Sequence, residues 1–162
     1  MAKVIVAIMC MALYTLTMAA NAITKDLGST NTKYQEARSN ENYNLDMERI
    51  MNECNETFRI EMTYLESLNE TGSFSDEADK TPKCFIRCML ENMDIMSSED
   101  GMFNPARAAI LFAGDRNGKP MEDIGDLTAI CADRREPCKC ERAYQFMRCL
   151  MSMEIEKYES KK

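Results

Sequence analysis

The chain has 162 residues, a formal net charge of −7, 15 methionines, eight cysteines and no histidine. The missing histidine excludes Ser-His-Asp and Cys-His catalysis. The acidic balance argues against a nucleic-acid partner, because phosphate recognition needs concentrated lysine and arginine. With 27 acidic residues, a solvated acidic face explains the carboxylate pairs better than a catalytic dyad does, so we expect no enzyme.

The first 22 residues have the features of a secretion signal. Lys3 supplies a positive start, and the apolar run from Val4 to Thr17 is too short to span a bilayer. Ala20-Asn21-Ala22 fits a cleavage site. We therefore expect a secreted, extracellular protein with residues 1–22 removed. Residues 23–44 are polar and without apolar period, which predicts a mobile arm.

From Leu45 the apolar pattern becomes helical. The first predicted helix has an apolar face at intervals of three and four residues: Met47, Met51, Cys54 and Phe58. A second, short helix carries Met62, Leu65 and Leu68 and ends near Gly72. Thr81, as an N-cap, and Pro82 predict the start of a third helix. Cys84 and Cys88 lie one turn apart on the same face of it.

The C-terminal half continues this pattern. Asn104 and Pro105 predict a short helix that ends near Ala113, and residues 114–120 form a turn cluster. A fifth helix is expected over about 121–133, with these side chains buried: Ile124, Leu127, Ile130 and Cys131. The last helix runs from Cys138 through Met153, and residues 154–162 are expected to be a solvated, charged tail. No segment alternates convincingly as a strand, so residues 45–153 predict one compact all-α domain of six helices.

Six cysteines follow one register, Cys54, Cys84, Cys88, Cys131, Cys140 and Cys149, with 29, 3, 42, 8 and 8 residues between them. A zinc site is not expected, because the chain has no histidine and no C-x2-C pair. An oxidising compartment favours disulfides, and six cysteines allow 15 pairings. On short helices, this spacing resembles that of the insect odorant-binding proteins. The runs 84–93 and 100–104 also resemble that family's third helix and following loop, whereas plant lipid-transfer proteins and saposin-like modules differ in cysteine spacing.

The resemblance implies the pairs Cys54–Cys88, Cys84–Cys140 and Cys131–Cys149, which would hold the domain with three disulfides. Cys138 falls outside the register. It could replace Cys140 in the bridge to Cys84, although the eight-and-eight spacing favours Cys140. Cys138 could otherwise join two chains into a homodimer, or remain a free thiol in a monomer.

The resemblance further implies an apolar cavity between the helices that carries a small hydrophobic ligand, with no cofactor and no metal. Unbranched methionine side chains adapt to varied ligands. The candidate wall residues, each of which could instead be core filler, are Met62, Leu65, Met89, Met93, Ile110, Phe112, Phe146, Met147 and Met151.

The predicted function is therefore transport of odorants or pheromones in extracellular sensory fluid, with contact to a membrane receptor left open. Two alternatives remain: a carrier of the same fold in reproductive or salivary secretion, and an interaction protein with a vestigial pocket. Histidine is the ordinary switch near pH 6. Without it, release of ligand on acidification would require carboxylates with raised pKa values.

Two N-glycosylation sequons occur in the expected secreted chain, at Asn55 and at Asn69. Asn55 follows the inward-facing Cys54 on a helix, so its side chain must point outward to be modified. Asn69 lies near a turn, which makes it the better candidate.

Overall fold

The computed structural model describes residues 45–159, so the predicted signal sequence and polar arm lie outside the described residues. Its helices are α3 (Met47–Phe58), α4 (Thr63–Thr71), α5 (Thr81–Asn92), α6 (Pro105–Phe112), α7 (Ile124–Ala132) and α8 (Lys139–Tyr158). Strands β1 (Asp115–Arg116) and β2 (Lys119–Pro120) form a small antiparallel hairpin between α6 and α7. Six helices with so little strand confirm the predicted all-α fold class. Within residues 45–159, no helix has the length and apolarity that a membrane crossing requires.

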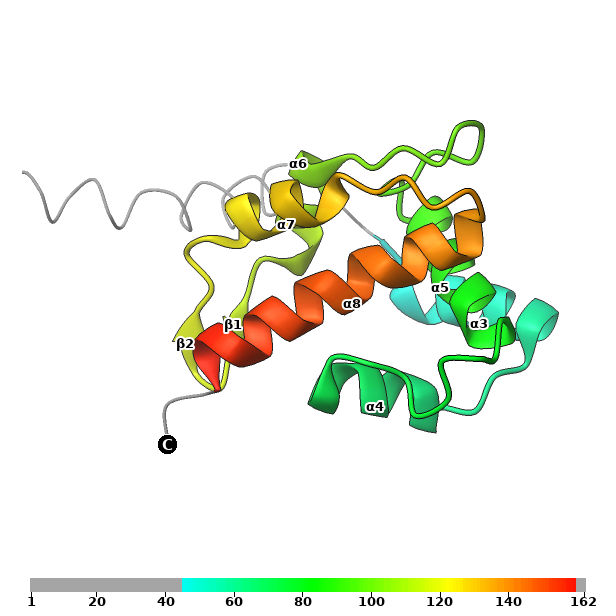
Figure 1. Ribbon diagram of the computed structural model, residues 1–162, viewed down its shortest axis with the longest axis horizontal. Coiled ribbons are helices and arrows are strands. Elements are labelled where there is room, and N and C mark those ends of the chain that lie inside the picture. The colour runs from blue at the N-terminus through cyan, green and yellow to red at the C-terminus, as the bar shows by residue number, and fades with distance from the viewer. Residues whose placement is uncertain (1–44, 160–162) are drawn as a thin grey trace, which may run out of the picture.

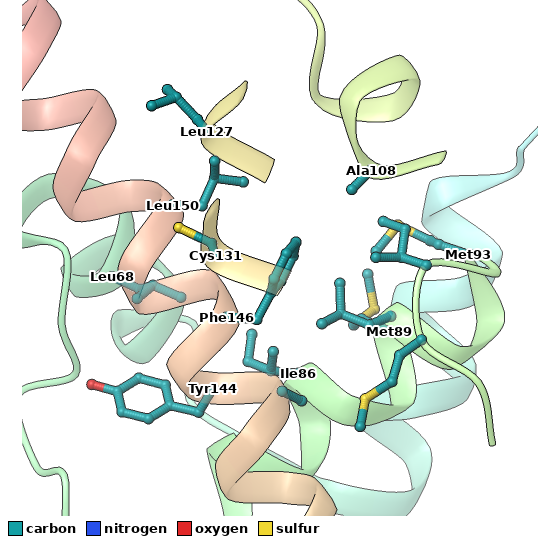
Figure 2. Packing of buried hydrophobic residues seen from close by; sticks show 14 of the residues in the cluster. Leu68, Ile86, Met89, Met93, Ala108, Leu127, Cys131, Tyr144, Phe146 and Leu150 are labelled. Atoms are coloured by element: carbon teal, nitrogen blue, oxygen red, sulfur yellow. The ribbon is translucent and has the colours of Figure 1, made fainter. Parts of the chain in front are cut away.

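The long helix α8 is the axis around which the others pack. In Figure 1 it runs through the middle of the molecule, with α4 along one side, α6 and α7 on the other, and the hairpin near its C-terminal end. Ala143, Phe146 and Leu150 are fully buried at helical spacing. Figure 2 shows Phe146 directed toward Met89 and Met93 of the α5 segment, while Tyr144 points away on another side of α8. Because it is buried on more than one face, α8 belongs to the centre of the core.

Three disulfides tie these helices together. Cys54–Cys88 joins α3 to α5, Cys84–Cys140 joins α5 to α8, and Cys131–Cys149 joins α7 to α8. Their Cα atoms lie 5.8, 4.5 and 5.7 Å apart, within the usual range for disulfides. These are the same three pairs that the cysteine register implies by resemblance. Closing loops of 18 to 56 residues contributes on the order of 3 to 4 kcal/mol per bridge in the chain-entropy model.

Local signals start and stop the helices largely as the sequence predicts. The Asn104 side chain caps α6 by accepting the N–H of Arg107 at 3.0 Å, and Pro105 follows in the first turn. Thr81, however, is the first residue of α5 and not its cap; the Asp79 carboxylate accepts the Thr81 N–H at 2.9 Å. A carboxylate is the stronger acceptor for a backbone N–H at a helix start, where the partial charge is positive.

Gly72 ends α4 in the left-handed conformation, with φ 79°. A Cβ atom at this position would lie 2.6 Å from the Oγ of Ser152 on α8. Glycine is therefore required twice here, for its backbone conformation and for the close packing of α4 against α8.

The structure corrects the predicted burial of Ile130, whose side chain is 60% exposed. The buried face of α7 is formed by Ile124, Leu127, Thr128 and Cys131. Successive helical residues are about 100° apart, which places Ile130 beside this face and not on it. Thr128 can be buried because its hydroxyl donates to the carbonyls of Pro105 and Gly125.

The predicted solvated tail is wrong for the part that the structure describes, because α8 continues through Tyr158. Glu154 and Tyr158 are only 3% and 8% exposed. Arg116 of β1 donates to the carboxylates of Glu154 and Glu159 at 3.0 and 2.8 Å, and the Tyr158 hydroxyl bonds to Asp123. Partners from the hairpin and from Asp123, just before α7, thus allow charged residues to extend α8 into a covered position.

Glu154 makes stability depend on pH in a specific direction. Burial raises the pKa of its carboxyl above the ordinary 4.5, with Asp123 and Glu159 adding to the rise and Arg116 opposing it. The folded protein therefore holds the Glu154 proton more tightly than the unfolded chain does. This contribution to stability is present at low pH and is lost as the pH rises through the folded pKa.

We expect the free energy of unfolding of the native protein to fall, relative to that of Glu154→Gln, as the pH rises from about 4 to 7, because the Glu154 carboxyl with its raised pKa then loses its proton in the folded state. Denaturant titrations at several pH values measure the difference. The exposed Glu156 on the same helix gives the control Glu156→Gln. Parallel pH curves for the native protein and Glu154→Gln would contradict the assignment.

Candidate functional site

A small apolar cavity of about 150 Å³ lies where five helices meet. Helix α5 and the residue after it supply most of its wall, and α3, α4, α6 and α8 contribute one residue each. The lining residues are Met47, Leu65, Phe85, Ile86, Met89, Leu90, Met93, Phe112 and Met147. Figure 2 shows three of them, Ile86, Met89 and Met93, on the side of the core that faces Phe146.

The sequence of α5 explains why this helix forms the floor of the cavity. Phe85 and Met89 form one row at a spacing of four, and Ile86 and Leu90 form the neighbouring row. All four side chains are buried. At about 100° per residue, the row of Cys84 and Cys88 lies roughly opposite these two rows. The disulfides to α8 and α3 therefore fix the rotation of α5 that directs its apolar rows into the cavity.

The cavity reaches solvent on the side of α3. Met47 is 42% exposed, whereas Leu65, Phe112 and Met147 are half-buried and the α5 wall is deep. A volume of about 150 Å³ is of the order that holds a benzene-sized molecule. Typical pockets for larger ligands occupy roughly 300 to 1,000 Å³. A longer ligand would therefore require the methionine side chains to change rotamer.

The cavity wall contains no nitrogen or oxygen atom and no titratable side chain. Ionisable groups lie in a separate, open hollow whose lining includes Glu91, Asp94, Glu99 and Asp100. Among the described residues, no group of three or more Cys, Asp or Glu side chains could hold a metal ion. The cavity can exclude water and hold apolar surface, and its wall offers no group for acid–base or nucleophilic chemistry.

The structure brings together five of the nine residues considered from the sequence: Leu65, Met89, Met93, Phe112 and Met147. The other four do not line the cavity. Phe146 is fully buried and stacks on Phe103 with ring centroids 4.5 Å apart, and Met62 is 48% exposed at the start of α4. Ile110 is half-buried on α6, and the Met151 sulfur lies 3.9 Å from the Arg116 guanidinium.

Four lining residues were not among the candidates: Met47, Phe85, Ile86 and Leu90. For each of them the sequence contains a pattern that indicates an inward-facing side chain. Met47 begins the predicted inward face of the first helix, and Phe85 precedes Met89 and Met93 in the apolar stripe of α5. Ile86 and Leu90 form a second row at the same spacing. Two adjacent apolar rows make a face wide enough to contact several helices at once.

A comparison with models of protein families identifies the family of this chain. The model of the PBP/GOBP family, the odorant- and pheromone-binding proteins of insects, matches residues 36–153. The chain belongs to this family. Its members are secreted carriers of small hydrophobic ligands, not enzymes. No curated protein and no solved structure gives a significant match.

Cys138 is an exposed free cysteine immediately before α8. Cys140, two residues later, is the one that bridges to Cys84. The thiol of Cys138 therefore remains available for reaction at the surface, while the other six cysteines of the described chain are in disulfides.

We expect an alkylating reagent to add one equivalent per folded, non-reduced monomer secreted without residues 1–22, because Cys138 is the one free, exposed cysteine among the described residues. Intact-mass measurement checks this, and Cys138→Ser should take up none. If two chains are instead joined through Cys138, a non-reducing gel will show a dimer band that Cys138→Ser abolishes. Alkylation of Cys138→Ser would instead indicate that another cysteine is unpaired.

Both sequon asparagines are exposed on helices. The Asn55 side chain accepts the N–H of Ile60 at 3.1 Å and so helps to close the end of α3. Asn69 lies three residues before Gly72, and it is its backbone carbonyl, not its side chain, that accepts from Arg116 at 2.6 Å. We therefore expect Asn69 to be the better site for a glycan.

Secretion from insect cells should yield a protein whose mass falls on treatment with peptide-N-glycosidase, because Asn69 is exposed beside a turn. Asn69→Gln should remove most of this mass difference, and Asn55→Gln is the matched control. If the mass difference disappears in Asn55→Gln and persists in Asn69→Gln, the glycan is on Asn55 instead.

Proposed function

We propose that the protein is a secreted carrier that binds odorants or pheromones in the cavity beside α5 and transports them in extracellular sensory fluid. The observation that carries the proposal is a wholly apolar cavity, formed by five helices, in a chain of the PBP/GOBP family. The three disulfides support the proposal, because covalent bonds between helices persist in an oxidising extracellular fluid and hold the cavity wall in place.

The energetics of the cavity suit reversible transport. Transfer of roughly 250 Å² of ligand surface from water at about 25 cal/mol per Å² contributes about 6 kcal/mol before the entropic cost of association is subtracted, so a benzene-sized ligand should bind no more tightly than tens of micromolar. Longer ligands that displace the flexible methionines would bury more surface and bind more tightly. An affinity in this range allows a ligand to be both taken up and released.

The small volume also favours a second candidate. About 150 Å³ is below the usual range for ligand pockets, as expected for an interaction protein whose pocket is vestigial. That protein would bind a macromolecular partner and no small ligand. A carrier in reproductive or salivary secretion would have the same cavity, and the tissue that contains the transcript distinguishes it from a sensory carrier.

Leu65→Trp should reduce affinity for N-phenyl-1-naphthylamine, a hydrophobic dye, by tenfold or more, because the indole would fill space that the half-buried Leu65 leaves open. Fluorescence titration of the dye measures the affinity. Met62→Trp is the matched control, since Met62 is close in sequence, exposed and outside the lining. It should bind the dye as the native protein does.

Thermal unfolding of both variants separates blockage from loss of the fold. Equal affinities for Leu65→Trp and Met62→Trp, with both folded, would place the ligand elsewhere. If the folded native protein binds neither the dye nor any of a panel of long-chain hydrocarbons, esters and alcohols, the carrier function fails and the interaction protein is favoured.

A further inference from the structure

We propose that the cavity prefers hydrocarbon groups over groups of the same shape that carry a hydroxyl or amine. The inference rests on the proposed carrier function and adds the chemical class of the ligand. It concerns the part of the ligand that fits inside. A longer molecule must leave its far end beside Met47, at the solvent edge.

The side chains of the wall offer a ligand no conventional hydrogen bond. All nine lining residues are methionine, leucine, isoleucine or phenylalanine. The only heteroatoms among them are the four thioether sulfurs, which are weak acceptors and cannot donate. A ligand hydroxyl or amine inside this wall would therefore leave its own donor or acceptor without a good partner.

The main chain does not supply the missing partner either. At the end of α5, where helical carbonyls are usually open, each relevant group is already used. The carbonyl of Met89 accepts the N–H of Met93, and that of Leu90 accepts the N–H of Ile95 at 2.9 Å. The Met93 carbonyl accepts from Arg107 Nε at 3.0 Å. The backbone carbonyls at this end of the cavity floor therefore already have hydrogen-bond partners.

Water is a poor substitute at this site. A buried water needs two to four polar partners, and the wall behind the solvent edge at Met47 exposes none to the cavity. A hydroxyl that leaves bulk water for this cavity therefore loses hydrogen bonds without replacement. The resulting loss of affinity should be at least about tenfold against an isosteric hydrocarbon.

Toluene and phenol form the sharpest pair for a test, because they differ by a methyl in place of a hydroxyl and both are neutral at pH 7. Binding is read from the ¹⁹F NMR signal of fluorobenzene as each compound displaces it from the full-length secreted protein. Toluene should compete at least about tenfold more effectively than phenol.

A variant that supplies a hydrogen-bond partner inside the cavity should reduce the preference for toluene over phenol. Met89→Gln replaces a buried thioether of the wall with an amide of similar length, so phenol should gain relative to toluene. Met151→Gln is the control, because Met151 is half-buried on α8 and outside the lining. Its ratio should equal that of the native protein, whose own ratio tests the inference even if Met89→Gln does not fold.

The outcomes separate the two proposals. Equal binding of toluene and phenol to the native protein overturns the selection of hydrocarbons and leaves the carrier function intact. Failure of toluene to bind also overturns the inference. The carrier function fails only if the dye and the longer ligands fail to bind as well.

Discussion

The structure depends most on two cysteines one helical turn apart on α5. Cys84 and Cys88 point to the same side of that helix and are bonded to α8 and α3, respectively. Two covalent bonds in different directions restrain both the position of α5 and its rotation about its axis. The apolar rows on the other side of the helix then have one orientation available, and this orientation forms the cavity floor.

Arg116 plays a corresponding part at the other end of α8. From the hairpin, it bonds to carboxylates on α8 and to the carbonyl of Asn69 on α4. This half-buried guanidinium joins three elements by electrostatics where no disulfide is present. One carboxylate oxygen in this group, Oε1 of Glu154, is buried without a hydrogen-bond partner. Of the described carboxyl groups with a shifted pKa, only that of Glu154 is raised, because its burial outweighs the attraction of Arg116.

The predictions from sequence mostly succeed where the cause is local, although the cap assigned to Thr81 is wrong because Asp79 accepts the Thr81 N–H. The spacing of Cys84 and Cys88, the Asn104 cap and the glycine at position 72 each act within one or two helical turns, and a single sequence contains them. The predictions fail where a distant partner decides the outcome. Ile130 is exposed because the centre of α7's buried face depends on which helices cover it, and Glu154 is buried because Arg116, distant in sequence, is folded against it. The cavity wall is partly predictable for the same reason: helix periodicity identifies inward faces but not where five of them converge.

The four methionines also make the cavity wall susceptible to oxidation. Oxidation of a thioether to the sulfoxide replaces an apolar, flexible side chain with a polar and chiral one. Met47, at the solvent edge, is the most exposed of the four and would meet an oxidant first. In the proposed carrier, each sulfoxide that is not reduced again would lower the affinity of that molecule for an apolar ligand. The side chains that would let the cavity adapt to varied ligands are thus also the ones most readily changed by an oxidant.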